Sequence, residues 1–182
     1  LLTRKASGQG RQDWRTDSNA QGDVNSRLLF FKNLQAVTNK IHATSNIDEI
    51  MLELSQDICN LFNCDRLTIY VTSEDKLSIV SRLKTGLNSF KDIRLPISEQ
   101  SVAGYVAVTR KLANIRDVYD EVELQGFSPN MHFLKAVDKR TGYRSKQMLV
   151  APIVDAQSHE LLGVIQLINN RADVPFPPQA DE

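Results

Sequence analysis

The 182-residue sequence lacks any apolar stretch long enough to cross a membrane as a helix. Its longest apolar runs, such as MLVAPIV at 148–154, are much shorter than the ~20 residues that a spanning helix needs. An excess of one charge is also missing, since 22 Lys and Arg residues balance 22 Asp and Glu residues. We therefore expect no direct membrane insertion, and no basic block or stripe favours binding to nucleic acid.

Cysteine is scarce, and the two that are present, Cys59 and Cys64, build neither a disulfide framework nor a metal-binding pattern. We interpret both as reduced, buried residues of a cytoplasmic protein. The three histidines, at positions 42, 132 and 159, have no second histidine or cysteine at ligand spacing. No metal site is predicted.

Sequence signatures of several enzyme classes are absent as well. There is no GxxxxGK[ST] loop, no GxGxxG after a predicted strand and no GxSxG elbow. The first residues also lack the apolar core of a secretory signal and an initiator methionine, which indicates the interior of a longer chain. We therefore expect a segment that is not an enzyme and that has no tightly bound cofactor.

Hydrophobic periodicity divides the chain into a polar start and one domain. Residues 1–23 are mostly small and polar, and we interpret them as a flexible linker. Apolar residues then recur every three or four positions over 24–44, which predicts an amphipathic helix, and a second helix is predicted over 45–62. The domain is expected to span 24–172, with 173–182 beginning a C-terminal linker or helix.

Alternating and continuous apolar patterns after residue 64 predict a sheet. The expected strands lie at 65–73, 77–84, 92–97, 112–117, 147–155 and 161–170, and hairpins join the first two and the last two. A helix is predicted from Ser98, as its N-cap, to residue 111, and a polar, irregular segment from about 117 to 146. Helices packed on the faces of a sheet indicate an α+β or α/β fold.

The start of the helix predicted from Ser98 offers a weak signal for anion binding. Free backbone N–H groups lie there, and the small or slim residues Val102, Ala103 and Gly104 would let a ligand approach closely. Glu99 argues against such a site, because a carboxylate in the first turn already satisfies the helix dipole. The alternative is an ordinary helix that packs on the sheet through its small residues.

The stretch AVDKRTGYRSKQMLVAPIV at 136–154 places polar residues directly before a strongly apolar strand. Asp138, Thr141, Arg144 and Ser145 are either the wall of a pocket or part of an ordinary solvated loop with a charge cluster. Their residue types alone leave both interpretations open.

Three stretches together resemble the GAF domain, in particular the tandem regulatory domains of cyclic-nucleotide phosphodiesterases and cyclases. They are LPISEQSVAGYVAVTRKLANIRDVYD at 95–120, VDKRTGYRSKQMLVAPI at 137–153 and GVIQLINN at 163–170. The resemblance implies an α+β fold: a twisted antiparallel six-stranded sheet with helices on both faces. It also implies a small-molecule pocket beneath the irregular segment.

The resemblance further implies roles for single residues. Val102 and Ala103 match the start of a helix whose backbone faces a cyclic phosphate. Asp138 matches a pocket acid that accepts a hydrogen bond from the base. Thr141 and Ser145 match hydroxyl-bearing contacts, since a hydroxyl can both donate and accept.

Other positions depart from the family's pattern. Leu134 stands where a relative has an aromatic contact, and Gln166 stands where it has glutamate on the last strand. The family's signature of Asn-Lys, a later Phe and then Asp-Glu is degraded here, because Asn169 is followed by a second asparagine. Arg171 and Asp181 are the expected supporting ion pair of that signature.

The resemblance implies a non-catalytic sensory domain that binds a small effector, with a cyclic nucleotide favoured, and that signals to an output domain of the same chain. The alternative is a ligand-free interaction module in a larger signalling protein or secretion-type ATPase. In that case the 24–44 helix would pair with its copy in a homodimer, and Leu28, Leu29, Phe31 and Leu34 would supply the contact. The overall character of the sequence suggests a bacterial source.

Overall fold

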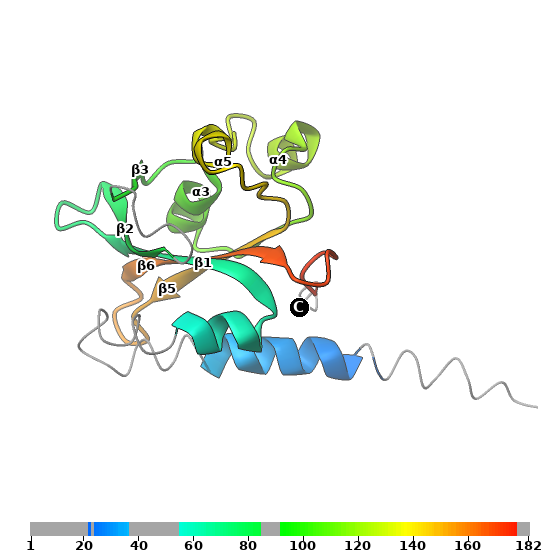
Figure 1. Ribbon diagram of the computed structural model, residues 1–182. Coiled ribbons are helices and arrows are strands. Elements are labelled where there is room, and N and C mark those ends of the chain that lie inside the picture. The colour runs from blue at the N-terminus through cyan, green and yellow to red at the C-terminus, as the bar shows by residue number, and fades with distance from the viewer. Residues whose placement is uncertain (1–21, 23, 37–54, 85–91, 178–182) are drawn as a thin grey trace, which may run out of the picture.

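The fold is described from a computed structural model, which covers residues 22, 24–36, 55–84 and 92–177. One antiparallel sheet forms its centre, and helices lie on both faces of that sheet (Figure 1). The prediction of an α+β fold with a six-stranded antiparallel sheet is confirmed. The predicted linker at 1–23, apart from Gly22, and the first part of the second predicted helix lie outside the described residues.

The strands are arranged in the order β3-β2-β1-β6-β5-β4. Each pair of neighbours is antiparallel, and the long strands β1 and β6 form the middle of the sheet. In β1, odd-numbered apolar residues and even-numbered polar residues alternate, so the two kinds of side chain point to opposite faces. The strand bounds are β1 (Cys64–Thr72), β2 (Ser78–Lys84), β3 (Arg94–Pro96), β4 (Ala113–Ile115), β5 (Met148–Val154) and β6 (Leu161–Asn170).

One face of the sheet is covered by helical residues 24–36 and 55–61 (Figure 1). Phe30 and Phe62 meet edge to face there, with ring centroids 5.5 Å apart. Cys59 and Cys64 are free and buried in the same core. A hydrogen bond with Cys59, together with burial, raises the pKa of Cys64. No helix in the described part of the chain is long and apolar enough to cross a membrane.

The opposite face carries α3 (Val102–Thr109), α4 (Glu121–Phe127) and α5 (Ala136–Thr141) (Figure 1). The helix predicted from Ser98 begins later, because the N-cap is Ser101, whose Oγ accepts a hydrogen bond from Gly104 N at 3.0 Å. The segment predicted to be irregular contains the two short helices α4 and α5. Asp120 caps α4 by accepting bonds from the N–H groups of Val122 and Glu123.

The packing of α3 depends on Gly104. A Cβ atom at this position would lie 2.3 Å from the carbonyl oxygen of Ser98 and 2.8 Å from that of Pro96. Any side chain would therefore push the helix away from the segment that follows β3. The start of α3 is held in a fixed place beside the sheet.

The chain after β6 turns back onto the domain. Phe176 is fully buried in the core, and Asn114 Nδ2 on β4 donates to the carbonyl oxygens of Phe176 and Pro177, each at 3.1 Å. The sequence predicts a linker or helix from residue 173 onward, and within that segment Phe176 is buried in the core.

Candidate ligand-binding cavity

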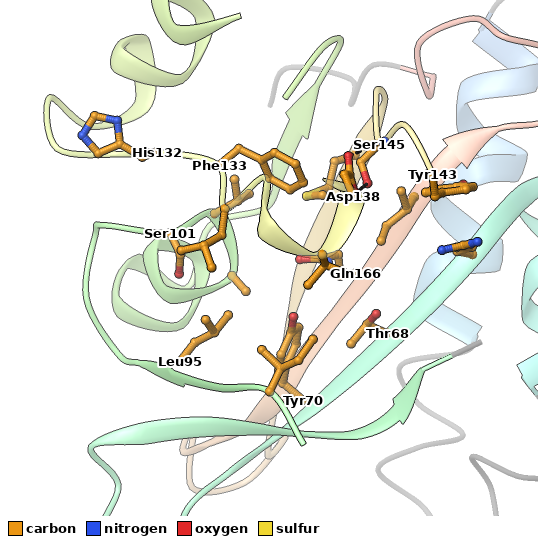
Figure 2. A pocket seen from close by; sticks show the side chains of 18 residues that line it. Thr68, Tyr70, Leu95, Ser101, His132, Phe133, Asp138, Tyr143, Ser145 and Gln166 are labelled. Atoms are coloured by element: carbon orange, nitrogen blue, oxygen red, sulfur yellow. Dashed lines mark hydrogen bonds between the residues drawn. The ribbon is translucent and has the colours of Figure 1, made fainter. Parts of the chain in front are cut away.

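A cavity of about 850 Å³, counted with its opening to solvent, lies on the face of the sheet that carries α3 and α5 (Figure 2). Strands β1, β5 and β6 form its floor, the start of α3 forms one side, and residues 132–145 cover it. We call residues 136–146, which comprise α5 and the loop after it, the lid. The polar residues before β5 were interpreted as either a pocket wall or a solvated loop. In the structure they belong to a lid that lies over a cavity.

Polar side chains from two adjacent strands occupy the floor. Thr68 on β1 stands directly opposite Gln166 on β6, and Tyr70 follows on the same face of β1 (Figure 2). All three are buried. Burial raises the pKa of Tyr70 to about 12, although a hydrogen bond with Gln166 acts in the opposite direction. The phenol is therefore neutral at physiological pH.

Two polar groups of the floor have no hydrogen-bond or ion-pair partner in the described part of the chain. The Thr68 hydroxyl is buried at the cavity surface and makes no hydrogen bond to a described residue. Arg66, two residues earlier on the same face, likewise makes no hydrogen bond or ion pair with one. Burying the Thr68 hydroxyl without a partner is costly, and the half-buried Arg66 has N–H donors that no described residue accepts, so both groups favour a ligand that supplies an acceptor.

The start of α3 meets the requirements for binding an anion. The N–H groups of Val102 and Ala103 have no acceptor among the described residues, whereas Gly104 N is capped. The expectation that Glu99 lies in the first turn is wrong. Glu99 precedes the N-cap and accepts a hydrogen bond from Ser128 Oγ at 2.9 Å, and the first turn contains no acidic residue. The positive end of the helix dipole is therefore left uncompensated at the cavity.

Asp138 fastens the two halves of the lid to each other. One carboxylate oxygen accepts from Ser145 N at 2.7 Å and from the Tyr119 hydroxyl at 3.0 Å, and the other accepts from Ser145 Oγ at 2.9 Å. Asp138 and Ser145 both line the cavity, as the sequence led us to expect (Figure 2). However, Asp138 and Ser145 use most of their hydrogen-bonding capacity on each other and on Tyr119.

Further contacts join the lid to the rest of the domain. Arg144 Nη2 binds both carboxylate oxygens of Asp117, at 2.9 and 3.0 Å, and its guanidinium lies over the ring of Tyr119. Partial burial acts to raise the pKa of Asp117, but hydrogen bonds from Tyr119 N and Arg144 outweigh it and hold that pKa below its ordinary value. Asn169, at the end of β6, donates to Arg144 O and accepts from Lys146 N.

Six of the seven side chains predicted to contact a ligand line the cavity: Val102, Ala103, Leu134, Asp138, Ser145 and Gln166. Thr141 does not, because its hydroxyl donates to Val137 O at 2.9 Å within α5. Leu134 lies at the mouth and is 67% exposed. The aromatic ring missing at that position is supplied one residue earlier, by Phe133 (Figure 2).

The pair predicted between Arg171 and Asp181 lies partly outside the described residues, since Asp181 is not among them. Arg171 Nη1 donates to Asn60 Oδ1 at 3.0 Å, and its backbone N–H donates to Asn63 O. The degraded signature thus ties the end of β6 to the turn before β1.

The sequence interpretation missed the contribution of β1. Arg66, Thr68 and Tyr70 alternate with apolar residues, and this alternation was the available signal. It predicted a strand with one polar face, which is the pattern of a strand facing water. The cover over that face comes from residues about 70 positions later, so the local pattern could not distinguish a cavity floor from an exposed surface.

Comparisons with known proteins agree on the family. A family model for the GAF domain matches residues 46–182. A probable 3′,5′-cyclic phosphodiesterase of Caenorhabditis elegans is 24% identical over 96% of this chain and 23% of its own length. The cone cGMP-specific 3′,5′-cyclic phosphodiesterase subunit alpha′ of Gallus gallus is 31% identical over 71% of this chain and 14% of its own. The chain thus spans less than a quarter of these relatives.

Solved structures show the same fold at low sequence identity. The GAF domain of a phosphoenolpyruvate-protein phosphotransferase from Coxiella burnetii has a TM-score of 0.58 and 18% identity, with 82% of each chain covered. A free methionine-R-sulfoxide reductase from Neisseria meningitidis, solved with its substrate, has a TM-score of 0.56 and 13% identity, covering 86% of this chain and 79% of that one.

Proposed function

The chain belongs to the GAF domain family, and we propose that it is a non-catalytic sensory domain that binds a cyclic nucleotide in the cavity and signals to an output domain of the same chain. One observation carries the proposal. A covered cavity has an uncompensated helix start at one side and buried polar groups on an otherwise apolar floor. A cyclic nucleotide combines one negative charge with a flat heterocycle whose edges are polar.

The phosphate is assigned to the start of α3. The N–H groups of Val102 and Ala103 are unengaged by described residues and lie at the positive end of the helix. Backbone N–H groups at such a position are well suited to an anionic phosphate. The absence of an acidic residue in the first turn supports this assignment.

The base is assigned to the floor and the roof of the cavity. Met148 and Ile168 offer apolar contact below, and Phe133 offers an aromatic ring above. Thr68 and Gln166 provide groups that can both donate and accept hydrogen bonds. Mostly apolar walls with a few placed polar groups are typical of small-molecule sites.

Two relatives support the ligand class. Both animal proteins described above are named as cyclic-nucleotide phosphodiesterases. Their greater length is consistent with a further domain that the bound state would regulate. The bacterial source suggested by the sequence stays a prediction. The cytoplasmic location, the reduced state of the cysteines and the domain limits stay predictions as well.

A melting experiment tests the proposal. A ligand present at ~100 times its dissociation constant stabilises the folded state by about 2.7 kcal/mol, which raises the melting temperature measurably. We expect cyclic AMP or cyclic GMP to produce such a shift, and inorganic phosphate at the same concentration to produce much less. If neither nucleotide moves the melting temperature at millimolar concentration, the cavity does not bind this class of ligand.

A second candidate function, dimerisation, rests on the helix at 24–36. Phe30 and Leu34 are buried against the domain, but Leu28 and Leu29 are 55% and 61% exposed, and Phe31 also faces outward. The apolar residues predicted to form a dimer contact are thus divided between the domain core and an outer stripe. An exposed apolar stripe of this kind fits a second copy of the same helix.

Sedimentation velocity over a range of concentrations tests the dimer. Leu28→Glu is expected to shift the 182-residue chain toward monomer, because a charge would be buried between two copies. Val122→Glu places the same charge at an exposed apolar residue of α4, away from this helix, and should leave association unchanged. A wild-type chain that remains monomeric at high concentration would contradict this function.

A further inference from the structure

We propose that Arg66 sets the base preference of the cavity. Its guanidinium binds the two neighbouring acceptors of a 6-oxopurine, O6 and N7, so that cyclic GMP binds more tightly than cyclic AMP. This inference rests on the proposed function, because it assigns one end of the same ligand.

Arg66 reaches the cavity from the sheet floor. It occupies the same face of β1 as Thr68 and Tyr70, and its partner across the strand pair is Ile168, which is apolar. Among the described residues that line the cavity, Arg66 is the one permanently charged cation, and its cross-strand partner offers no side-chain acceptor. An arginine stays protonated at any physiological pH.

The guanidinium is held in a defined orientation. Its central carbon lies 3.4 Å from the ring centroid of Tyr143, and the Tyr143 hydroxyl donates to Asp65 at 2.6 Å. The hydrogen bond to Asp65 fixes the ring, and the ring in turn fixes the plane of the guanidinium. Stacking uses only the flat face of the group.

The N–H edge of Arg66 is left unused by this stacking. No described residue accepts a hydrogen bond from it or pairs with its charge. Asp65 is the adjacent acid, and its oxygen instead accepts from Tyr143. The cavity thus presents a planar, preoriented set of donors that needs an acceptor from a ligand.

Arg66 and the start of α3 are suited to opposite ends of one ligand. Ser101, the cap of α3, and Tyr143, the platform of Arg66, are seen on opposite sides of the cavity in Figure 2, with Gln166 between them. A cyclic nucleotide with its phosphate at α3 directs its base toward the Arg66 side. The edge of the base that meets Arg66 then decides the preference.

The chemistry of the two purines differs at this edge. Guanine presents two acceptors, O6 and N7, which match the planar fork of a guanidinium. Adenine presents N7 beside an amino group, and the N–H of that amino group would face an N–H of Arg66. By the discrimination typical of such paired contacts, cyclic GMP should bind about 10- to 100-fold more tightly than cyclic AMP.

Gln166 does not impose the opposite preference. Its amide both donates and accepts, and it can rotate to suit either base, whereas an arginine can only donate. The fixed donor set of Arg66 is therefore the selective element.

Calorimetric titration of the 182-residue chain with cyclic GMP, cyclic IMP and cyclic AMP tests the inference. Cyclic IMP keeps O6 and N7 but lacks the 2-amino group of guanine, so it should bind nearly as tightly as cyclic GMP. In Arg66→Gln the preference for the two 6-oxopurines should fall to about threefold or less, with the affinity for cyclic AMP little changed. Arg82→Gln, an exposed arginine outside the cavity, should keep the full preference.

A measurement on the unaltered chain tests the same contact without depending on the folding of the variant. The 7-deaza analogue of cyclic GMP lacks the N7 acceptor, and we expect it to bind about 10-fold more weakly than cyclic GMP. Equal affinity for cyclic GMP and this analogue overturns the role of Arg66, as does equal weakening of both nucleotides by Arg66→Gln. Binding of no cyclic nucleotide at all would overturn the proposed function itself, which is a separate and recognisable result.

Discussion

The face of the sheet beneath helical residues 24–36 and 55–61 is filled by apolar side chains, whereas the face beneath the lid keeps polar side chains around an unfilled space. Leu67 and Ile69 belong to the first face, and Thr68 belongs to the second. Neighbouring residues of one strand therefore have different roles: Leu67 and Ile69 fill the core, and Thr68 lines the cavity. Both faces bury an apolar cluster, but the second face also carries polar groups that cost stability and suit a ligand.

The arrangement of helices follows the same division. Two helical segments close over the apolar face, while α5 and the loop after it cover the cavity and are fixed by hydrogen bonds and ion pairs such as Arg144 with Asp117. Contacts of this kind at a solvent-accessible surface contribute little stability. The lid is thus held to the domain largely by polar contacts.

The largest expected effect comes from a pair of substitutions at adjacent residues. Leu67→Ala should lower the free energy of unfolding by about 2–5 kcal/mol, because it leaves a cavity in a filled core. Thr68→Val should change it by less than about 1 kcal/mol, because the valine has a similar shape and removes a hydroxyl that lacks a protein partner. Urea unfolding of both variants measures the contrast.

The ligand adds a second readout to this pair. Thr68→Val should weaken binding of a cyclic nucleotide several-fold, while the folded fraction of Leu67→Ala should still bind. Equal destabilisation by the two substitutions would mean that the two faces do not differ as described.

The second effect concerns the response of the cavity floor to alkaline pH. Tyr70 has a pKa of about 12 in the folded state, compared with about 10 for an ordinary tyrosine. The folded state therefore holds this proton more tightly, and stability falls as pH rises from about 10 to about 12, by roughly 2–3 kcal/mol from this residue. Tyr70→Phe removes the titrating group, so its urea midpoint should fall less steeply over that range.

Tyr119 and Tyr143 serve as comparisons for this prediction. Burial raises the pKa of both, but both lie at the lid or the rim and not on the floor. Their phenylalanine variants should keep the part of the alkaline loss that comes from Tyr70. A Tyr70→Phe profile parallel to that of the wild type would show that the phenol on the floor is not the buried group described here.

The smallest effect tests the start of α3 without disturbing the fold. Val102 is the first residue of the helix, a position where proline is well tolerated. Ser101 already has the extended backbone that precedes proline, with φ −123° and ψ 159°. Val102→Pro removes one N–H donor and should weaken cyclic-nucleotide binding about 10-fold, or ~1.4 kcal/mol, by calorimetry.

Val102→Ala is the matched control for this substitution, because it trims the side chain but keeps the N–H group. Its affinity should remain close to that of the wild type. If both variants bind equally well, the phosphate does not lie on the start of α3.

The sequence predicted the sheet well and the cover of the cavity poorly, for physical reasons. Strands such as β5 and β6 carry long apolar patterns, so their extents were predicted within a residue or two. Helices α4 and α5 have seven and six residues and little apolar periodicity, so the sequence suggested an irregular segment. Their short length leaves them dependent on tertiary contacts, such as those of Asp138.

The candidate site shows the same limit. Residues within the recognisable stretches, such as Asp138 and Gln166, were predicted at the ligand site from the resemblance, and both line the cavity. Arg66 was not, because its neighbours Tyr143 and Asp65 are far apart in sequence and meet only in the folded domain. The hydroxyl of Thr141 was expected at the cavity, but the backbone of α5 provides a nearer acceptor.

Asn169 has a consequence for how the domain could pass on a bound state. Its side-chain amide makes hydrogen bonds with the backbone of Arg144 and Lys146 in the lid. A few residues further along the chain, Phe176 is buried in the core. One side chain thus connects the lid to the segment that leaves the sheet. A ligand that displaced the lid would therefore reach that segment through the hydrogen bonds of Asn169.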